Sequence, residues 1–388
     1  MTKKQRFLTA VRGEVPDAVP VAPLLHWRFA HRLLGRHHWK DVIEAHRRVG
    51  STFFRGPISI GPHSDFDTRW GMEGRVLERD GTMTRCERVI RTRLGSLRAE
   101  HVIGFSPDDP TLGFTTEYFV KQPEGFRIVI DYWEAELAHA GLPSHEDLDE
   151  AAQILGEEGV PSAIINSAFS RACLMRGMQG MLLDLYDAPD LVREALRVAL
   201  ELRRQEVRSF LASKGDVLVY DICWATGANM GPRMFRDWVF PELEQVCEMV
   251  RRAPGKYVGF YTLGRIRDLL PAMLDARPHF IETFEQNEGD ITLAEAKAKY
   301  GKQVCLMGNF DPLVLQDGTL EEARREAKRC LEEGMRGGGY VLVTGDEVPP
   351  TARIENLKAM VEVAEEFGRY QRPAVAGGTG KAQGGVGE

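Results

Sequence analysis

Short apolar runs alternate with longer helix-like stretches along most of the chain. Eight runs are rich in β-branched residues, have the length of a strand and are followed by glycine or polar turns. They are Val19–Leu25, Ser51–Ile58, Ser162–Asn166, Val217–Asp221, Tyr257–Tyr261, Phe280–Phe284, Val304–Gly308 and Tyr340–Thr344. The pattern predicts eight parallel strands, the number that closes a (β/α)8 barrel.

Amphipathic stretches between most of these runs predict the helices of that barrel. They cover residues 187–212, 231–252, 266–274, 320–334 and 354–367. Alternation of strand and helix favours an α/β fold with a parallel sheet. We therefore expect one barrel domain over residues 1–373.

The segment 61–151 breaks the alternation. An Asp-Gly pair at 80–81 lies between two β-rich arms, which is a strong hairpin signal. A second hairpin is predicted from Phe114–Val120 and Phe126–Tyr132. We expect an antiparallel insertion after the second strand, forming a cap that screens the catalytic face of the barrel from water.

Composition narrows the classes of protein to consider. A chain of 388 residues with 43% hydrophobic residues is long for one ordinary domain but normal for a barrel with an insertion. It has no apolar run of about 18 residues and no signal-peptide pattern at its start, so we expect a cytoplasmic protein without a membrane partner. The net charge of -7 argues against a nucleic-acid partner. The six cysteines are scattered without a C-x-x-C pair, and the glycine-rich tail 374–388 is expected to be disordered.

Reacting groups in such a barrel come from the carboxyl ends of strands and the loops after them. This rule nominates as catalytic residues Asp221, Tyr261, Asp346 and Glu347. It nominates as substrate-binding residues His26, Arg28, Arg32, Asn166, Tyr220, Glu282, Glu285, Asn309 and Asp311. Carboxylates that converge on a screened pocket raise one another's pKa, which keeps one of them protonated as a general acid.

Several nominations also have a purely structural interpretation. Asp221 could cap the next turn, and the carboxylates at 346–347 could stabilise theirs. Asn309 and Asp311 belong to an Asn-x-Asp-Pro sequence, which forms turns and caps helices. The basic residues at 26–32 fit either an anion clamp or a solvated face.

The final predicted strand carries the clearest motif. It is entered through three glycines and leads into Thr344-Gly345-Asp346-Glu347-Val348-Pro349-Pro350, then a helix that begins Glu-Asn-Leu. This resembles the carboxyl-terminal signature of the uroporphyrinogen decarboxylase superfamily, T-G-x-E-x-P-P. Further blocks resemble its methyltransferase-like branch, in the same order, at 6–21, 177–185, 220–243, 288–293 and 307–312. The resemblance implies a (β/α)8 fold.

Two departures limit what the resemblance implies about chemistry. The decarboxylases carry R-Q-A-G-R-Y after the first strand, whereas this chain reads His26-Trp27-Arg28-Phe29-Ala30-His31-Arg32. The zinc methyltransferases place their ligands in H-x-C-G and T-G-C-E turns. Here those ligand positions are Tyr261, Leu263 and Asp346, so we expect no bound metal and no tightly bound cofactor.

The resemblance favours a methyltransferase. It would move a methyl group from a small methyl ether, aromatic ethers included, to a corrinoid. Because the chain lacks a D-x-H-x-x-G cobalamin signature, the corrinoid would arrive on a partner carrier protein. Asp221, Asp346 or Glu347 would protonate the departing oxygen, and Tyr261 would orient the substrate.

Two alternatives stay open. One is a metal-independent decarboxylase of a small carboxylated substrate, in which Arg28 or Arg32 holds a carboxylate and Asp221 stabilises a cationic intermediate. The other is a barrel that binds a ligand without catalysis. Homodimers are common in the superfamily, so a homodimer is open as well.

Overall fold

The computed structural model describes residues 1–36, 38–55, 60, 72–106, 112–139, 141 and 143–370. The predicted disordered tail 374–388 and the end of the second predicted strand lie outside these residues.

A parallel sheet of six strands forms the centre of the fold, in the order β10-β9-β8-β7-β6-β5. Its strands are β5 (Ser162–Asn166), β6 (Val217–Asp221), β7 (Tyr257–Tyr261), β8 (Phe280–Thr283), β9 (Cys305–Phe310) and β10 (Tyr340–Thr344). Each corresponds to one of the last six predicted runs. The prediction of an α/β fold with a parallel sheet is confirmed.

The first predicted strand is much shorter in the structure. Val21 forms an isolated parallel bridge with Leu342 of β10. The Leu342 amide donates to the Pro20 carbonyl at 2.9 Å. Pro20 and Pro23 have no N–H, which reduces the hydrogen bonds this segment can give to a ladder.

The second predicted strand is also reduced to a bridge. Phe53 pairs in parallel with Gly159, and its carbonyl accepts from the Val160 amide at 2.7 Å. The Thr52 amide donates to the Val21 carbonyl at 2.8 Å. Backbone hydrogen bonds therefore lead from β10 through both segments to the residues just before β5.

Apolar side chains pack in two clusters, one on each face of the parallel sheet. Along β6, Val217 and Val219 belong to a smaller inner cluster, which also holds Phe54 and Phe280. Leu218 and Tyr220 belong to the larger outer cluster under the helices. Because side chains alternate along a strand, Asp221 shares the inner face with Val219.

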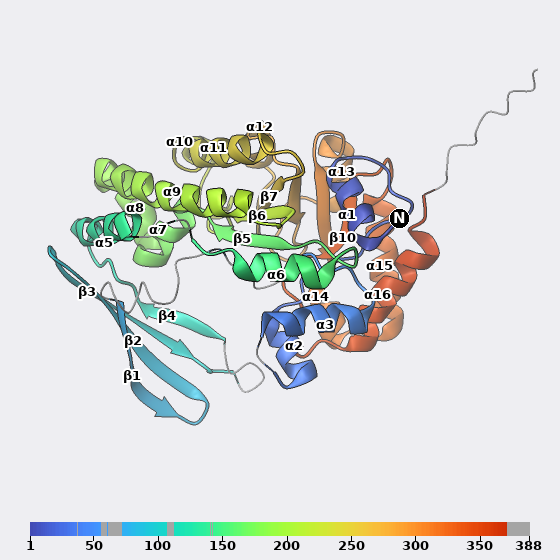
Figure 1. Cartoon of the computed structure of the whole chain (residues 1–388), viewed down its shortest axis with the longest axis horizontal. Coiled ribbons are helices and arrows are strands. Elements are labelled where there is room, and N and C mark those ends of the chain that lie inside the picture. The colour runs from blue at the N-terminus through green and yellow to red at the C-terminus, as the bar shows by residue number, and fades with distance from the viewer. Residues whose placement is uncertain are drawn as a thin grey trace, which may run out of the picture.

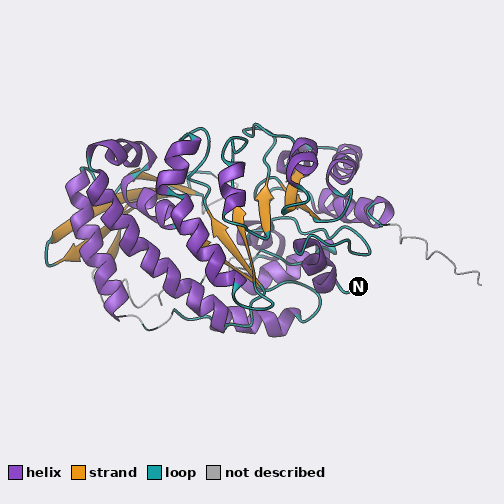
Figure 2. Ribbon diagram, turned by 90° about the horizontal axis from the view of Figure 1, so that it is seen from above, coloured by secondary structure: helices purple, strands orange, loops and turns teal. Residues whose placement is uncertain are grey.

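Helices surround the parallel sheet, as Figure 2 shows from above. They are α1 (Lys3–Val11), α2 (Trp27–Leu34), α3 (Trp39–Val49), α7 (Ala168–Arg176), α8 (Met178–Asp187), α9 (Pro189–Ala212), α10 (Pro232–Trp238), α11 (Phe240–Arg251), α12 (Leu270–Asp275), α13 (Leu293–Tyr300), α14 (Pro312–Asp317), α15 (Leu320–Gly334) and α16 (Ile354–Phe367). The predicted helix 231–252 is divided at Val239, and the helix predicted over 266–274 begins only at Leu270. None of the helices in the described part of the chain combines the length and apolar character needed to span a bilayer.

The insertion forms a separate antiparallel sheet, seen at the lower left of Figure 1. Its strands pair in sequence order and are β1 (Met72–Asp80), β2 (Met83–Thr92), β3 (Gly95–Ile103) and β4 (Gly113–Glu117). Asp80 pairs with Met83 across the turn, and Gly81 has a φ of 58°. The hairpin predicted from the Asp-Gly pair is confirmed, because glycine adopts this left-handed conformation at little cost.

The second predicted hairpin is wrong. β4 pairs with β3, while Phe126–His139 forms helix α5 after the short 3-10 turn η1 (Pro123–Gly125). Phe126, Val129, Ile130 and Trp133 are all buried. Their spacing of three and four residues is that of one helix face, and it outweighs the β-branched composition of the segment.

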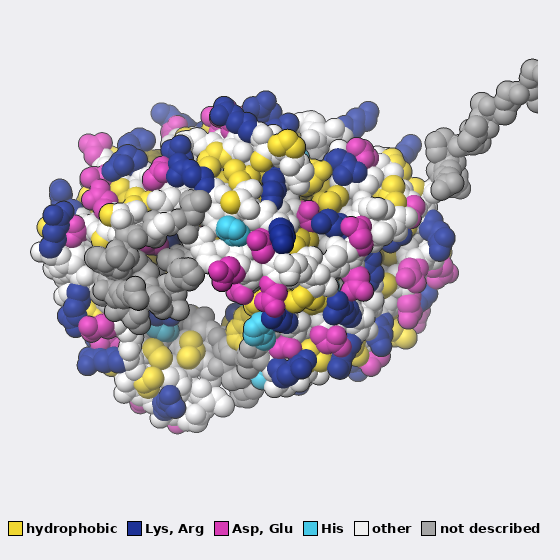
Figure 3. Space-filling view, viewed as in Figure 1, with side chains coloured by type: hydrophobic (Ala, Val, Ile, Leu, Met, Phe, Trp, Pro, Cys, Tyr) yellow, Lys and Arg dark blue, Asp and Glu magenta, His cyan; other side chains and the backbone are white. Residues whose placement is uncertain are grey.

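The insertion contacts the elements that follow the carboxyl end of β5. The Val120 amide donates to the Met175 carbonyl in α7 at 2.9 Å, and the Arg176 guanidinium donates to the Lys121 carbonyl at 3.0 Å. After α5, helix α6 (Glu146–Leu155) returns the chain to β5. Figure 3 shows an opening between the antiparallel sheet and the rest of the molecule, with acidic side chains along its edge.

Candidate functional site

Five polar side chains meet at the carboxyl end of the inner face of the sheet. This inner group consists of Arg55, Asp221 from the end of β6, Tyr261 from the end of β7, Glu282 from β8 and Asp346 from the turn after β10. Parallel strands bring their carboxyl ends to one edge of a sheet, so residues distant in the sequence become neighbours there.

Arg55 is the cation of the inner group. Its guanidinium carbon lies 3.9 Å from the centre of the Tyr261 ring, and its Nη1 lies 3.7 Å from Glu282 Oε1. Burial opposes the charged guanidinium, but Glu282, Tyr261 and Asp221 together raise the pKa of Arg55 above its ordinary value. Arg55 is therefore a fixed positive charge over an aromatic ring.

Glu282 is the most enclosed carboxyl group of the site. Its side chain is 0% exposed, and neither carboxyl oxygen has a hydrogen-bond partner among the residues that the structure describes. Burial is the main cause that raises its pKa to about 7; Asp221 and Asp346 add to the rise, and Arg55 opposes it. A carboxyl group with this pKa is protonated in a large fraction of molecules near pH 7 and can act as a general acid.

Tyr261 and Asp346 form a second pair beside Arg55. The Tyr261 hydroxyl donates to Asp346 Oδ1 at 2.7 Å, and the same oxygen accepts the Glu347 amide at 2.7 Å. Burial, and then Asp346, raise the pKa of the Tyr261 phenol well above its ordinary value. Tyr261 therefore stays protonated and fixes the orientation of Asp346.

Three more predicted residues form the rim of the site. Glu347 Oε1 lies 3.8 Å from His26 Nε2, and Glu347 Oε2 lies 3.7 Å from Arg28 Nη1. All three side chains are between 24% and 35% exposed. They place mixed charges at an entrance that water can reach.

Other predicted residues occupy different places. Tyr220 faces the outer helices and donates to Glu242 at 3.3 Å. Asn309 donates to the Phe284 carbonyl at 2.9 Å and accepts from Arg329 of α15 at 3.0 Å. These contacts direct both side chains away from the inner group.

The remaining predicted residues have local structural contacts. Asp311 is the N-cap of α14, and Glu285 accepts the Gly264 amide at 2.9 Å. Arg32 is exposed in the last turn of α2. Asn166 ends β5, and its carbonyl accepts from Arg203 at 3.4 Å.

The sequence reasoning missed Arg55. Phe53 belongs to the outer cluster and Phe54 to the inner one, so strict alternation would direct Arg55 outward. The segment is not a regular strand in the structure, and Arg55 instead reaches Tyr261 and Glu282. The available signal was the arginine itself, because a charged residue within an apolar run needs a buried partner.

The three positions that the zinc branch uses for ligands do not fit zinc. Leu263 has no donor atom, and the Tyr261 hydroxyl already donates to Asp346. Among the residues that the structure describes, no three histidine, cysteine, aspartate or glutamate side chains are grouped to hold a metal ion.

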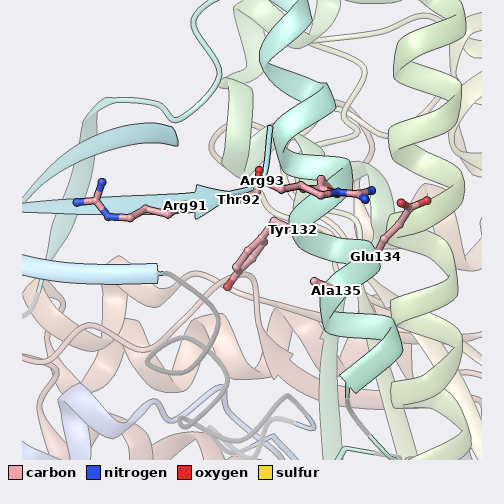
Figure 4. A pocket seen from close by; sticks show the side chains of 7 residues that line it. Arg91, Thr92, Arg93, Tyr132, Glu134 and Ala135 are labelled. Atoms are coloured by element: carbon pink, nitrogen blue, oxygen red, sulfur yellow. The ribbon is translucent and has the colours of Figure 1, made fainter. Parts of the chain in front are cut away.

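The described cavities lie outside the inner group. A cavity of about 400 Å³ lies between the end of β2 and helix α5 (Figure 4). There Arg93 extends toward Glu134 and donates to Asp131 at 2.8 Å, while Arg91 points away. Two further cavities, of about 380 and 450 Å³, are lined by Lys3 and Ser51, and neither includes a member of the inner group.

Comparison with known families shows to which protein family the chain belongs. The family model described as "Uroporphyrinogen decarboxylase (URO-D)" matches residues 149–367, which is more than half of the chain. The chain belongs to the uroporphyrinogen decarboxylase family. The matched region carries Asp221, Tyr261, Glu282 and Asp346, but not Arg55.

Curated relatives of two named activities match the chain. A uroporphyrinogen decarboxylase of Neisseria meningitidis serogroup A is 26% identical over 241 residues, covering 57% of this chain and 61% of the relative. The methylcobamide:CoM methyltransferase MtaA of Methanosarcina barkeri is 27% identical over 179 residues, covering 46% of this chain and 50% of the relative. The match therefore spans about half to three fifths of these relatives.

A solved structure extends the likeness to nearly the whole fold. A methyltransferase from Methanosarcina mazei superposes with a TM-score of 0.66 at 18% sequence identity. The alignment covers 95% of this chain and 99% of that one. At this level of identity the likeness establishes the fold.

Proposed function

We propose that this member of the uroporphyrinogen decarboxylase family transfers a methyl group from a small methyl ether to a corrinoid on a partner carrier protein. The observation that carries the proposal is Glu282, a fully buried carboxyl group with a pKa of about 7 whose oxygens accept no hydrogen bond from the described part of the chain. An alkoxide or phenoxide is a poor leaving group unless it receives a proton. Glu282 is the group of the site best suited to supply one.

The corrinoid would supply the nucleophile that accepts the methyl group. The residues of this chain would protonate the ether oxygen as it leaves. The bond between methyl carbon and ether oxygen breaks, its electron pair stays on oxygen, and the Glu282 proton moves to that oxygen. Arg55 would stabilise the resulting carboxylate, since its guanidinium already faces Glu282 at 3.7 Å. Solvent then returns the proton to Glu282 for the next turnover.

The proposal includes closure of the sheet into an eight-stranded barrel. The backbone hydrogen bonds from Leu342 to Pro20, from Thr52 to Val21 and from Val160 to Phe53 support it. Closure would hold Arg55 opposite Glu282 and exclude bulk water from the acid. Asp221 and Asp346 would flank the bound substrate beside Glu282, with His26, Arg28 and Glu347 at the rim.

A second candidate is decarboxylation of a small carboxylic acid. Arg55 favours it, because neutral Glu282 would leave the guanidinium free to bind a substrate carboxylate. The carbon–carboxylate bond would break, carbon dioxide would leave, and Glu282 would protonate the carbanion. This scheme uses the same acid as methyl transfer and differs in the substrate group that Arg55 holds.

One pair of assays separates the candidates. The full chain is incubated with free cob(I)alamin and a panel of methoxylated aromatic compounds and small aliphatic methyl ethers, and methylcobalamin is followed by its absorption. The corresponding carboxylic acids, labelled at the carboxyl carbon, are assayed for release of labelled carbon dioxide. Methylcobalamin formation supports the proposal, whereas release of carbon dioxide alone replaces it with the second candidate.

Glu282→Gln tests the acid within either assay. We expect kcat to fall by about 100-fold or more, because a positioned general acid contributes about that much. The control is Glu206→Gln, which removes another buried carboxyl group of pKa about 7 on the outer face of the sheet. Equal losses in the two variants would exclude Glu282 as the proton donor.

A further inference from the structure

A second buried glutamate lies behind the site, on the outer face of the sheet. Glu242 in α11 is 6% exposed and accepts three hydrogen bonds. Its Oε2 accepts the Ala168 amide at 2.7 Å and the Tyr220 hydroxyl at 3.3 Å, and its Oε1 accepts the Phe169 amide at 3.3 Å. One carboxylate thus joins the first turn of α7 to Tyr220, the residue that precedes Asp221 in β6.

The first turn of α7 also holds the Asp221 backbone. The Ser167 amide donates to the Asp221 carbonyl at 2.8 Å, and the Ser170 hydroxyl donates to the same carbonyl at 3.3 Å. Ser167 is the N-cap of α7, and its hydroxyl oxygen accepts the Ser170 amide at 3.0 Å. Asp221 is therefore fixed from both sides, through Tyr220 and through α7, and Glu242 touches both.

We propose that Glu242 is a positioning residue that, as a carboxylate, holds Asp221 at its place beside Arg55 and Glu282. An ionised carboxyl group offers acceptors on both oxygens and no donor, which matches the Ala168 and Phe169 amides, one on each oxygen, and lets the Tyr220 hydroxyl donate as well. We call these three hydrogen bonds the Glu242 clamp. Protonation of Glu242 puts a hydrogen on one carboxyl oxygen, where it faces the donors that this oxygen had accepted, so part of the Glu242 clamp is lost. The inference rests on the proposed function only where activity is the readout.

Titratable side chains from three neighbouring elements act electrostatically on Glu242 or respond to it. They are Tyr220 of β6, Cys173 of α7 and Arg203 of α9. Burial raises the pKa of Glu242 to about 7, while the amides of Ala168 and Phe169, the Tyr220 hydroxyl and Arg203 oppose the rise. Near neutral pH the Glu242 carboxyl group therefore changes between its charged and neutral forms.

Glu282 and Glu242 have similar pKa values, but the reaction requires them in opposite protonation states. Glu282 must be protonated to act as an acid, so activity falls above about pH 7. Glu242 must be ionised to hold Asp221, so activity falls below about pH 7. The wild-type enzyme should have a bell-shaped profile of kcat against pH.

Glu242→Gln removes one side of that profile. We expect the fall on the acid side to disappear while the fall on the alkaline side remains, and kcat at pH 8 to drop about tenfold. Glu206→Gln is the matched control, because Glu206 also has a pKa of about 7 yet bonds to Arg203 and not to α7. It should keep both limbs; an unchanged acid limb in Glu242→Gln would overturn the proposal.

Hydrogen exchange of the wild-type chain tests the clamp without any substrate. Protection of the Ala168 and Phe169 amides, corrected for intrinsic exchange, should decrease as pH falls from 8 to 6. This holds even if the enzyme proves to be a decarboxylase, or if Glu242→Gln does not fold. Protection that is constant over this range would overturn the proposal, whatever the outcome of the methyl-transfer assay.

Discussion

The two faces of the parallel sheet each bury a glutamate whose pKa is raised to about 7, and the two differ in their hydrogen bonds. Within the described ranges, Glu282 on the inner face has no hydrogen bond to either oxygen, whereas Glu242 on the outer face accepts three. Burial is the main cause of the rise in both. The value of the pKa therefore does not separate an acid from a structural clamp.

The contacts around each carboxyl group distinguish the general acid from the structural carboxylate. The Glu282 carboxyl group lies beside Arg55 without a hydrogen bond from the described residues, so it can present its proton to a ligand. A carboxylate that accepts two amides and a phenol hydroxyl uses most of its acceptor sites within the fold and instead fixes what surrounds it. Four predictions test this contrast, beginning with the largest effect.

Arg55→Leu should affect the inner face most strongly. Without the guanidinium, we expect kcat to fall by about 100- to 1000-fold, as when a preorganised electrostatic donor is removed. The pKa of Glu282 should rise further, because Arg55 is the group that lowers it. The measurement is the pH profile of kcat, whose alkaline limb should move to higher pH.

Arg55→Lys is the control for charge. A lysine keeps the positive charge but not the planar group over Tyr261, so the alkaline limb should stay near that of the wild type. If Arg55→Leu leaves the limb in place as well, Arg55 does not control the proton on Glu282.

Glu282→Gln should change the dependence of stability on pH. The pKa of Glu282 is raised on folding, so this group favours the folded state at low pH and loses that contribution as pH rises from about 4.5 to about 7. At pH 8 the variant should be more stable than wild type by up to about 3 kcal/mol, with little difference at pH 4.5. Urea unfolding at both pH values measures the difference.

Glu242→Gln sharpens this comparison. Its gain at pH 8 should be smaller, because the glutamine replaces a carboxylate that was satisfied by three donors. Equal gains in the two variants would mean that the hydrogen bonds of Glu242 are energetically unimportant.

Tyr261→Phe should have an intermediate effect. It removes the 2.7 Å hydrogen bond to Asp346 but keeps the ring beneath Arg55. A hydrogen bond to a charged group contributes about 1.5 kcal/mol or more, so kcat/KM should fall about tenfold. Steady-state kinetics measure it, and a loss as large as that of Arg55→Leu would point to a direct role of the hydroxyl in catalysis.

Tyr220→Phe should have the smallest effect. It removes one long hydrogen bond of 3.3 Å and leaves both amide contacts of Glu242 intact. We expect kcat to fall less than about threefold, since a neutral donor contributes about 0.5 to 1.5 kcal/mol at most and this bond is long. A pH profile without its acid limb would show that the phenol, and not α7, transmits the effect of Glu242.

The periodic pattern of the sequence predicts the regular part of the fold well. Six of the eight strand runs appear as strands, and the helix predicted at 354–367 has the same bounds in the structure. The Asp-Gly hairpin follows from local turn chemistry. The helix α5 was mistaken for a strand because β-branched composition was given more weight than the spacing of its buried residues.

The sequence predicted only those site residues that lie at or just after the carboxyl end of a strand. Asp221 and Tyr261 end regular strands and Asp346 follows one, so their positions at the carboxyl edge could be predicted from order along the chain. Arg55 and Glu242 could not be found in this way. One lies after a segment with a single bridge, and the other acts through helix α7.

What the sequence by itself determined is therefore the α/β alternation, the family signature and the set of acids at strand ends, because each depends on residues close together in the chain. The tertiary structure alone decided which acid is buried without a hydrogen bond from the described residues, which acid accepts the amides of α7, and that Arg55 covers Tyr261. These contacts join segments that are distant in the chain, such as Arg55 and Tyr261 or Glu242 and Ala168, and no local pattern encodes them.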